Sequence, residues 1–292
     1  MASLPSGTSQ FFLDFFPAAH AALQHRLPNL WDQMQPGWLA AACPEVALPL
    51  GCSGCSGGSG AAAPFLLRNP SLLPVQLAGV AVAVAGLVHL RAPRWAYLRA
   101  SLLFFAAMQT SSIVCHVLAT RGSGLWHAAL LADVAATGAS SLCLLASQAL
   151  PAPTTTAGAA AATRRCWAGA AAVVAGVATL RSLPWVPEAT YIGTTALASA
   201  ATGLGLLRRW AALPAHARVR HLPALALAGL GVAAMVLSLP LDPLLCAAAG
   251  PWLGTVPVLF AGCDLGFAAL VLLAADGEGL AAAGGGRAEK AD

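Results

Sequence analysis

The residues whose types and spacing could do chemistry lie in one stretch, 109–133. Ser112 and His116 are four residues apart and share one helix face, with Gln109 on the same face. A short turn leads to a second apolar helix that carries Asp133. These groups could form a metal-hydrolase site, with His116 as a ligand and Asp133 as orienter or proton acceptor, or a structural contact between helices. The residues alone favour the structural contact, because catalytic zinc needs three protein ligands and one histidine supplies one.

Two polar stripes must position these groups. The first helix carries Gln109, Ser112 and His116, and the second carries Asp133, Thr137 and Ser140 or Ser141. Both sets recur with helical spacing, so each forms a stripe on one face of its helix. Because a tight turn joins the two helices, we expect the stripes to face each other.

The composition is that of a membrane protein. The chain has 292 residues, of which 58% are hydrophobic and only 9% are charged, whereas soluble domains carry about 25% charged residues. The formal net charge of +4 is too small to indicate nucleic acid as a partner.

Apolar runs divide the chain into three parts. Segment 1–64 contains cysteines and a Gly/Ser linker, segment 65–274 is the membrane domain, and segment 275–292 reads as a disordered, charged Gly/Ala-rich tail. The membrane domain contains seven runs near the roughly 20 residues that cross a bilayer, at about 71–90, 97–119, 126–149, 166–183, 189–207, 222–241 and 251–274. Segment 151–163 reads as a loop of low complexity. The predicted fold is an all-α, integral membrane seven-helix bundle.

The arginines predict the orientation of this bundle. With the N-terminus outside, the cytosolic loops contain eight arginines and the opposite loops contain two. The positive-inside rule therefore places the N-terminus on the exoplasmic side and the C-terminus in the cytosol. His116 and Asp133 then lie in the outer leaflet, with Asp133 roughly 10 Å into its helix at 1.5 Å per residue.

The eight cysteines fall into two groups. Four lie in segments outside the spans, where an exoplasmic location favours disulfides over a zinc knuckle: Cys43, Cys52, Cys55 and Cys246. The other four lie in or beside apolar spans and are expected to be buried structural side chains, with a reactive role as the alternative: Cys115, Cys143, Cys166 and Cys263.

The stretch SSIVCHVLATRGSGLWHAALLADVAATGASSLCLLAS resembles the second and third spans of the myomaker and transmembrane protein 8 family. That family belongs to the CREST superfamily of seven-helix membrane proteins, which includes alkaline ceramidases. The matching positions are Ser112, His116, Gly122, Gly124, Asp133 and Gly138. RNPSLLPVQLAGV resembles the start of the family's first span, and YIGTTALA resembles its fifth span. The resemblance covers about 66–275 and is specific across 109–145. It implies zinc-dependent amide or ester hydrolysis of a lipid, with Ser112 stabilising the oxyanion, His116 on zinc and Asp133 handling water or a proton.

The last helix departs from the superfamily pattern. Its two further histidine ligands, spaced HxxxH, would fall at Val258 and Gly262, and neither residue can bind a metal. Cys263 with Asp264, or His127, are the available substitutes.

The departure in the last helix favours a myomaker-type membrane protein with a degenerate hydrolase site. It would act through contacts with membrane lipids or other membrane proteins, in the plasma membrane or a secretory-pathway membrane. The alternative is a zinc-dependent lipid hydrolase. A transporter is disfavoured because the sequence shows neither an inverted repeat nor a broken mid-membrane helix.

Overall fold

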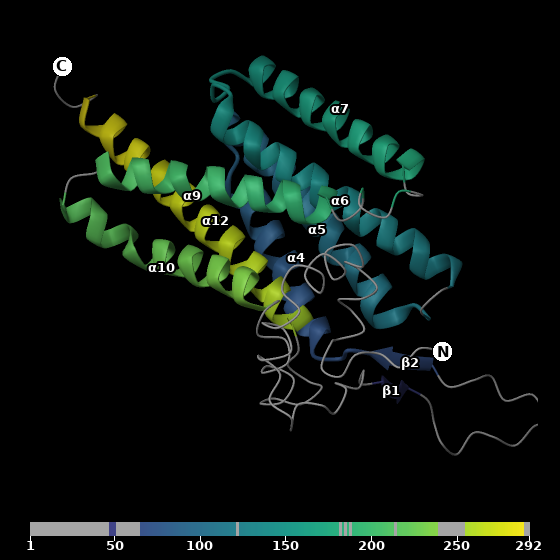
Figure 1. The fold of residues 1–292 in the computed structure, drawn as a ribbon. Helices are drawn as coiled ribbons and strands as arrows, with labels where there is room; N and C mark the ends of the chain where they lie inside the picture. The colour runs from purple at the N-terminus through teal and green to yellow at the C-terminus, as the bar shows by residue number, and fades with distance from the viewer. Residues whose placement is uncertain are drawn as a thin grey trace, which may run out of the picture.

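The computed structural model of the chain describes residues 47–50, 65–120, 123–180, 183, 186, 189–212, 215–238 and 255–288 (Figure 1). The predictions for the N-terminal segment before residue 47, for the linker and for four cysteines lie outside the described residues. Those cysteines are Cys43, Cys52, Cys55 and Cys246.

Long helices dominate the described residues. They are α4 (Leu72–His89), α5 (Ala96–Ser112), α6 (Gly124–Ala149), α7 (Thr156–Leu180), α9 (Thr194–Ala212), α10 (Ala215–Ser238) and α12 (Thr255–Ala288). Two shorter π-helical segments, Ile113–Leu118 and Ala189–Gly193, continue α5 and precede α9. Each long helix overlaps one of the seven predicted spans. The helical class of the membrane domain is therefore confirmed.

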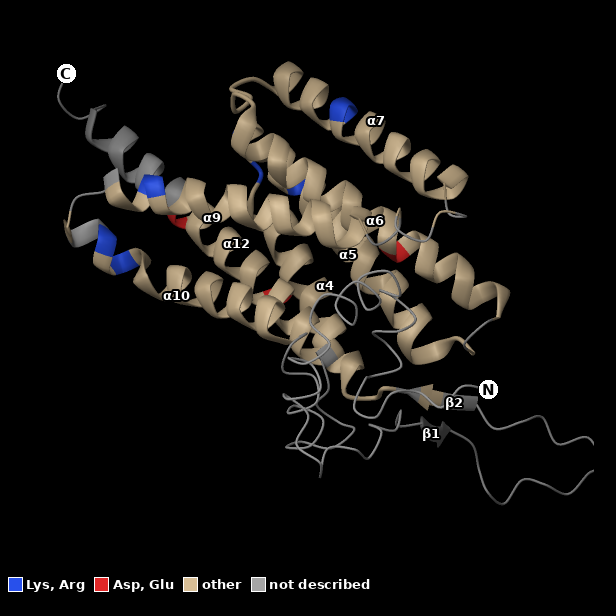
Figure 2. Ribbon diagram, in the orientation of Figure 1, with Lys and Arg blue, Asp and Glu red and all other residues tan. Residues whose placement is uncertain are grey.

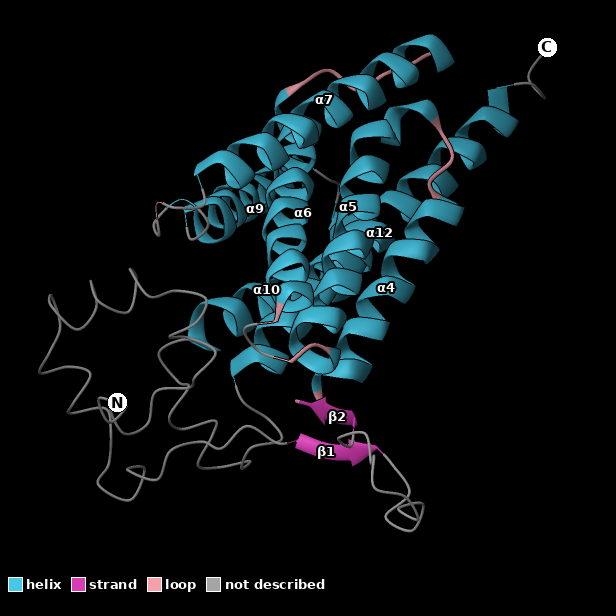
Figure 3. Ribbon diagram, turned by 90° about the vertical axis from the view of Figure 1, so that its right-hand side faces the viewer, coloured by secondary structure: helices cyan, strands magenta, loops and turns pink. Residues whose placement is uncertain are grey.

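A two-stranded antiparallel sheet precedes α4 at one end of the bundle (Figure 3). Strand β1 (Ala47–Leu50) pairs with β2 (Phe65–Arg68), with Ala47 opposite Arg68. The sequence pattern did not predict this sheet. Asn69 follows β2 with a φ of 43°, a left-handed conformation in which Asn is several-fold enriched. This residue turns the chain from the sheet into α4.

Helices α4, α5, α6 and α12 surround the main apolar core. Helix α5 packs against α4 and α6, and α12 packs against α4 and α10. Phe105 of α5 and Phe260 of α12 are fully buried in this core. The ring of Phe105 also stacks on Phe267, with 4.0 Å between ring centroids. Helix α7 lies at the outside of the bundle (Figures 1 and 3).

Five helical segments among the described residues are long and apolar enough to cross a membrane: Leu72–His89, Pro93–Leu118, Gly124–Ala149, Arg218–Ser238 and Val256–Asp276. Their outer faces carry large apolar side chains, as Leu77, Val84 and Val88 of α4 show with about half of each exposed. Charged residues are sparse along the helices (Figure 2). An apolar outer surface of this extent indicates a lipid environment. The described helices are those of a multi-pass membrane protein.

The largest extensions beyond the predicted bounds are in α7 and α12. The prediction of a loop at 151–163 is wrong from Thr156 onward, where α7 begins. The hydroxyl of Thr155 accepts a hydrogen bond from the backbone N–H of Gly158 at 3.1 Å, as an N-cap does, and the alanine run that follows has high helix propensity. At the other end, α12 continues to Ala288, into the segment for which the composition predicts a disordered tail.

Candidate functional site

A π-helical turn positions His116. Helix α5 ends at Ser112, and the next six residues, Ile113–Leu118, form a π-helix. The backbone N–H of Ala119 closes this segment by donating to the carbonyl of Val114 at 2.7 Å, an i→i+5 hydrogen bond. Single π turns inside helices occur frequently at functional sites. His116 therefore lies on a wider turn than the regular helix that its spacing predicts.

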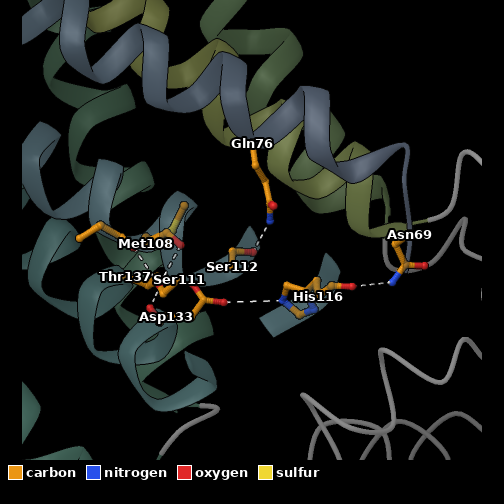
Figure 4. A network of polar contacts seen from close by, with 9 residues as sticks. Asn69, Gln76, Met108, Ser111, Ser112, His116, Asp133 and Thr137 are labelled. Atoms are coloured by element: carbon orange, nitrogen blue, oxygen red, sulfur yellow. Dashed lines mark hydrogen bonds and ion pairs between the residues drawn. The ribbon is translucent and has the colours of Figure 1, made fainter. Parts of the chain in front are cut away.

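His116 meets Asp133 inside the bundle (Figure 4). The Nε2 atom of His116 lies 3.7 Å from Oδ2 of Asp133, within ion-pair range when the imidazole is protonated. The side chain of Asp133 is fully buried and that of His116 is 5% exposed. Within the described residues, neither carboxylate oxygen of Asp133 has a hydrogen-bond partner. The structure thus brings together the imidazole and the carboxylate that sequence analysis paired.

The serine of the predicted site bonds to a different helix. The side-chain amide of Gln76, on α4, donates a hydrogen bond to Oγ of Ser112, and both side chains are fully buried (Figure 4). Near the same end of α4, the amide of Asn69 donates to the backbone carbonyl of His116 at 3.4 Å. Helix α4 and its preceding turn therefore hold the junction between α5 and the π-helical segment.

Gln109, the third residue of the predicted polar stripe on α5, also faces a helix other than α6. Instead of facing α6, the Gln109 amide donates to Oδ1 of Asp264 on α12 at 2.6 Å. Gly79 of α4 provides the space for this pair, because a Cβ atom there would collide with both side chains. The polar stripe of α6 does contact α5 through Ser140, which pairs with Ser101. The hydroxyl of each serine donates a hydrogen bond to the backbone carbonyl of the other at 2.9 Å.

Sequence reasoning missed two members of this buried polar region. Gln76 is an uncharged polar residue within an apolar run. A search of these runs for amide side chains as well as ionisable groups would have found it. Tyr191 lies in the second π-helical segment, which packs against α6. It is buried in the main core, within electrostatic range of Asp133, Cys115 and Cys263. Two π-helical segments thus approach Asp133.

The described residues do not fit a catalytic zinc site. Among them there is no group of three or more His, Cys, Asp or Glu residues arranged to hold a metal ion. On α12, the buried ring of Phe260 packs edge-on against His116, with 6.1 Å between ring centroids. Gly262 faces away toward α10, where a Cβ atom would lie 2.7 Å from the carbonyl oxygen of Gly231. A histidine side chain at position 262 would therefore point toward α10 and not toward His116, and its Cβ atom would collide with α10.

The residues considered as substitute metal ligands, Cys263, Asp264 and His127, have other contacts. The thiol of Cys263 contacts the sulfur of Met235 on α10 at 3.4 Å, and Asp264 accepts its hydrogen bond from Gln109. The side chain of His127 is exposed and packs against Trp126, with 4.9 Å between ring centroids. The site thus offers one imidazole and one carboxylate, a pair that could hold a water molecule or share a proton.

The fold and the site together define a helical, multi-pass integral membrane protein with a polar cluster buried among its helices. Comparison of the chain with protein-family models, curated proteins and solved structures found no match in any of the three.

Proposed function

We propose that the chain is a membrane protein of the myomaker and transmembrane protein 8 type, with seven spans, an exoplasmic N-terminus and a cytosolic C-terminus. Residues 109–145, which carry the resemblance, contribute Ser112, His116 and Asp133 to one buried region. The proposal adds α7 and α9 to the five apolar spans. Arginine pairs in these two helices, at 164–165 in α7 and 208–209 in α9, fall on the proposed cytosolic side.

The protein acts, in this proposal, through contacts with membrane lipids and other membrane proteins. Its polar cluster fixes the helices that form those contacts. The observation that carries this proposal is that the cluster's polar pairs join different elements: Gln76 to Ser112, Gln109 to Asp264, and His116 to Asp133. Buried hydrogen bonds such as the first two contribute to helix association in membranes. The positions that would complete a metal site hold Val258 and Gly262.

Metal analysis and a hydrolysis assay test this proposal on the detergent-purified full chain. We expect substoichiometric zinc and no release of fatty acid from vesicles that contain ceramide or lysophospholipid. His116→Ala and Asp133→Asn should lower the melting temperature while leaving that baseline unchanged. Zinc near one per chain, together with hydrolysis that both folded variants lose, would overturn the proposal.

The alternative function is hydrolysis of a lipid in the outer leaflet. One observation favours it: the carboxylate of Asp133 is buried, faces His116 and has no hydrogen-bond partner within the described residues. A buried carboxylate that accepts no hydrogen bond is costly, and such groups are functional candidates in membranes. The described residues supply too few ligands for zinc, so this alternative requires ligands from another part of the chain.

Labelling of introduced cysteines tests the orientation. We expect Ser123→Cys to react with a membrane-impermeant maleimide added outside intact cells, and Arg218→Cys to react only after permeabilisation. The background for both should lack the native cysteines that label from outside. Reaction at position 218 in intact cells would reverse the proposed orientation.

A further inference from the structure

Two buried cysteines lie in the contact between α6 and α7. Cys143 of α6 is 2% exposed and Cys166 of α7 is 6% exposed, and both are free thiols in this structure. They belong to one cluster of buried residues that also contains Ala139, Ala162 and Ala170, and the partly buried Ala146 and Ala159 pack against it. These alanines lie three, four or seven residues from one of the cysteines, so they share its helix face. Small side chains at these positions let the two helix backbones approach closely.

The register of the two helices places the cysteines at a similar height along the contact. A Cβ atom at Gly138 of α6 would lie 2.9 Å from the side chain of Val173 on α7, which fixes one point of contact. Helices α6 and α7 are consecutive and joined by a short connection, so they run antiparallel. Advancing five residues along α6 and returning seven along α7 leads from this contact to Cys143 and Cys166. The two displacements differ by only about 3 Å at 1.5 Å per residue.

The two thiols also lie within interaction range of each other. A disulfide requires its Cα atoms to lie within about 7 Å, a separation that closely packed, alanine-lined helices provide. We propose that Cys143 and Cys166 form a reversible disulfide that links α6 to α7 and makes this helix contact sensitive to oxidants.

A hydroperoxide and a cellular thiol are the co-reactants of this chemistry. One thiol loses its proton and attacks the peroxide; the O–O bond breaks, giving a sulfenic acid and releasing water or an alcohol. The second thiol attacks the sulfenic sulfur, the S–S bond forms and water leaves. Two electrons pass from the thiols to the peroxide. Two equivalents of cellular thiol return them by disulfide exchange.

The pair is separate from the polar cluster. Cys143 lies ten residues beyond Asp133 on α6, a distance of about 15 Å along the helix at 1.5 Å per residue. In the proposed orientation this end of α6 is cytosolic, where disulfides are mostly transient and redox-sensing. That compartment rests on the proposed function, whereas the pairing of the thiols rests on the helix contact alone.

Peptide mapping of the full chain tests the pairing. Detergent-purified protein is treated with hydrogen peroxide, its remaining thiols are blocked with N-ethylmaleimide, and it is digested without reduction. We expect a linked peptide that contains Cys143 and Cys166, and its disappearance after dithiothreitol. The oxidised protein should also melt at a higher temperature than the reduced protein.

Three variants make the result specific. Cys143→Ala and Cys166→Ala should each abolish the linked peptide and the difference in melting temperature, while the matched control Cys263→Ala keeps both. Alanine suits both positions, since alanines already line the contact. Absence of the 143–166 peptide from wild-type protein whose other thiols do oxidise would overturn the proposal, as would linkage of either cysteine to a different partner. This result is independent of the zinc and hydrolysis measurements.

Discussion

Helix α12 packs against its neighbours by two different means on two opposite faces. Asp264 faces α4 and α5 and accepts a hydrogen bond from Gln109 at 2.6 Å. Gly262, only two residues earlier, faces α10, where added Cβ atoms at Gly262 and Gly231 would each come within 3 Å of the other's carbonyl oxygen. Two residues correspond to about 200° around a helix of 3.6 residues per turn.

The polar face and the glycine face of α12 tolerate different substitutions. On the polar face, side-chain atoms make the contact, and they can move to a new rotamer when a neighbour changes. On the glycine face, backbone atoms make the contact, so an added methyl group must move a whole helix. Packing of small residues and interhelical hydrogen bonds are both common in membrane bundles. On α12 these two kinds of contact lie on opposite faces of the helix.

The largest expected effect is on the glycine face. Gly231→Ala or Gly262→Ala should lower the free energy of unfolding by about 3 kcal/mol, because the methyl group overlaps a backbone carbonyl. Gly229→Ala and Gly266→Ala are matched controls on the same two helices, with nothing within 4 Å of the added Cβ. Unfolding in mixed micelles measures the difference. Equal effects for contact and control glycines would contradict the close contact.

A smaller effect is expected on the polar face. Asp264→Ala leaves the buried amide of Gln109 without its acceptor and should cost about 1–2 kcal/mol. Asp264→Asn retains an oxygen acceptor and serves as the conservative control. In a double-mutant cycle, Gln109→Ala should recover about 0.5–1.5 kcal/mol of the loss. Additive effects of the two alanine substitutions would mean that the pair contributes no coupling.

The smallest effect is expected for the serine pair at the end of α5. Ser112→Ala removes the acceptor of the Gln76 amide and should cost about 1 kcal/mol. Ser111→Ala is its neighbour and control. The Ser111 hydroxyl bonds only to carbonyls of its own helix among the described residues, so its loss should change stability by less than about 0.5 kcal/mol. If the two variants unfold alike, the Gln76–Ser112 bond does not hold α4 to α5.

The helices could be predicted from the sequence because long apolar runs are a strong signal. The predicted span 126–149 agrees with α6 to within two residues, and 71–90 agrees with α4 to within one at each end. The start of α7 could not be predicted from the same signal. Residues 156–163 are small and weakly apolar, and an alanine-rich run with threonines reads equally as a loop until its cap is seen.

The site could be predicted only in part. The spacing predicted that His116 would face Asp133, and the imidazole does face the carboxylate, whereas Ser112 bonds to α4. The partners of Ser112 and Gln109 come from α4 and α12, far away in sequence, and periodicity within one helix does not specify them. The spacing rule also assumed a regular α-helix through His116. The residues give no signal of the π turn.

That π turn has a consequence for how the site could change. A π turn contains about one residue more than an α turn. The segment Ile113–Leu118 therefore changes the angular position of the residues that follow it relative to the residues of α5. If the π turn moved toward α5, the side chains it passed would swing around the helix axis while α6 stayed in place. His116 would turn relative to Asp133, and Tyr191 lies on a second π-helical segment that packs against α6. Both π-helical segments thus pack against α6, the helix that carries Asp133.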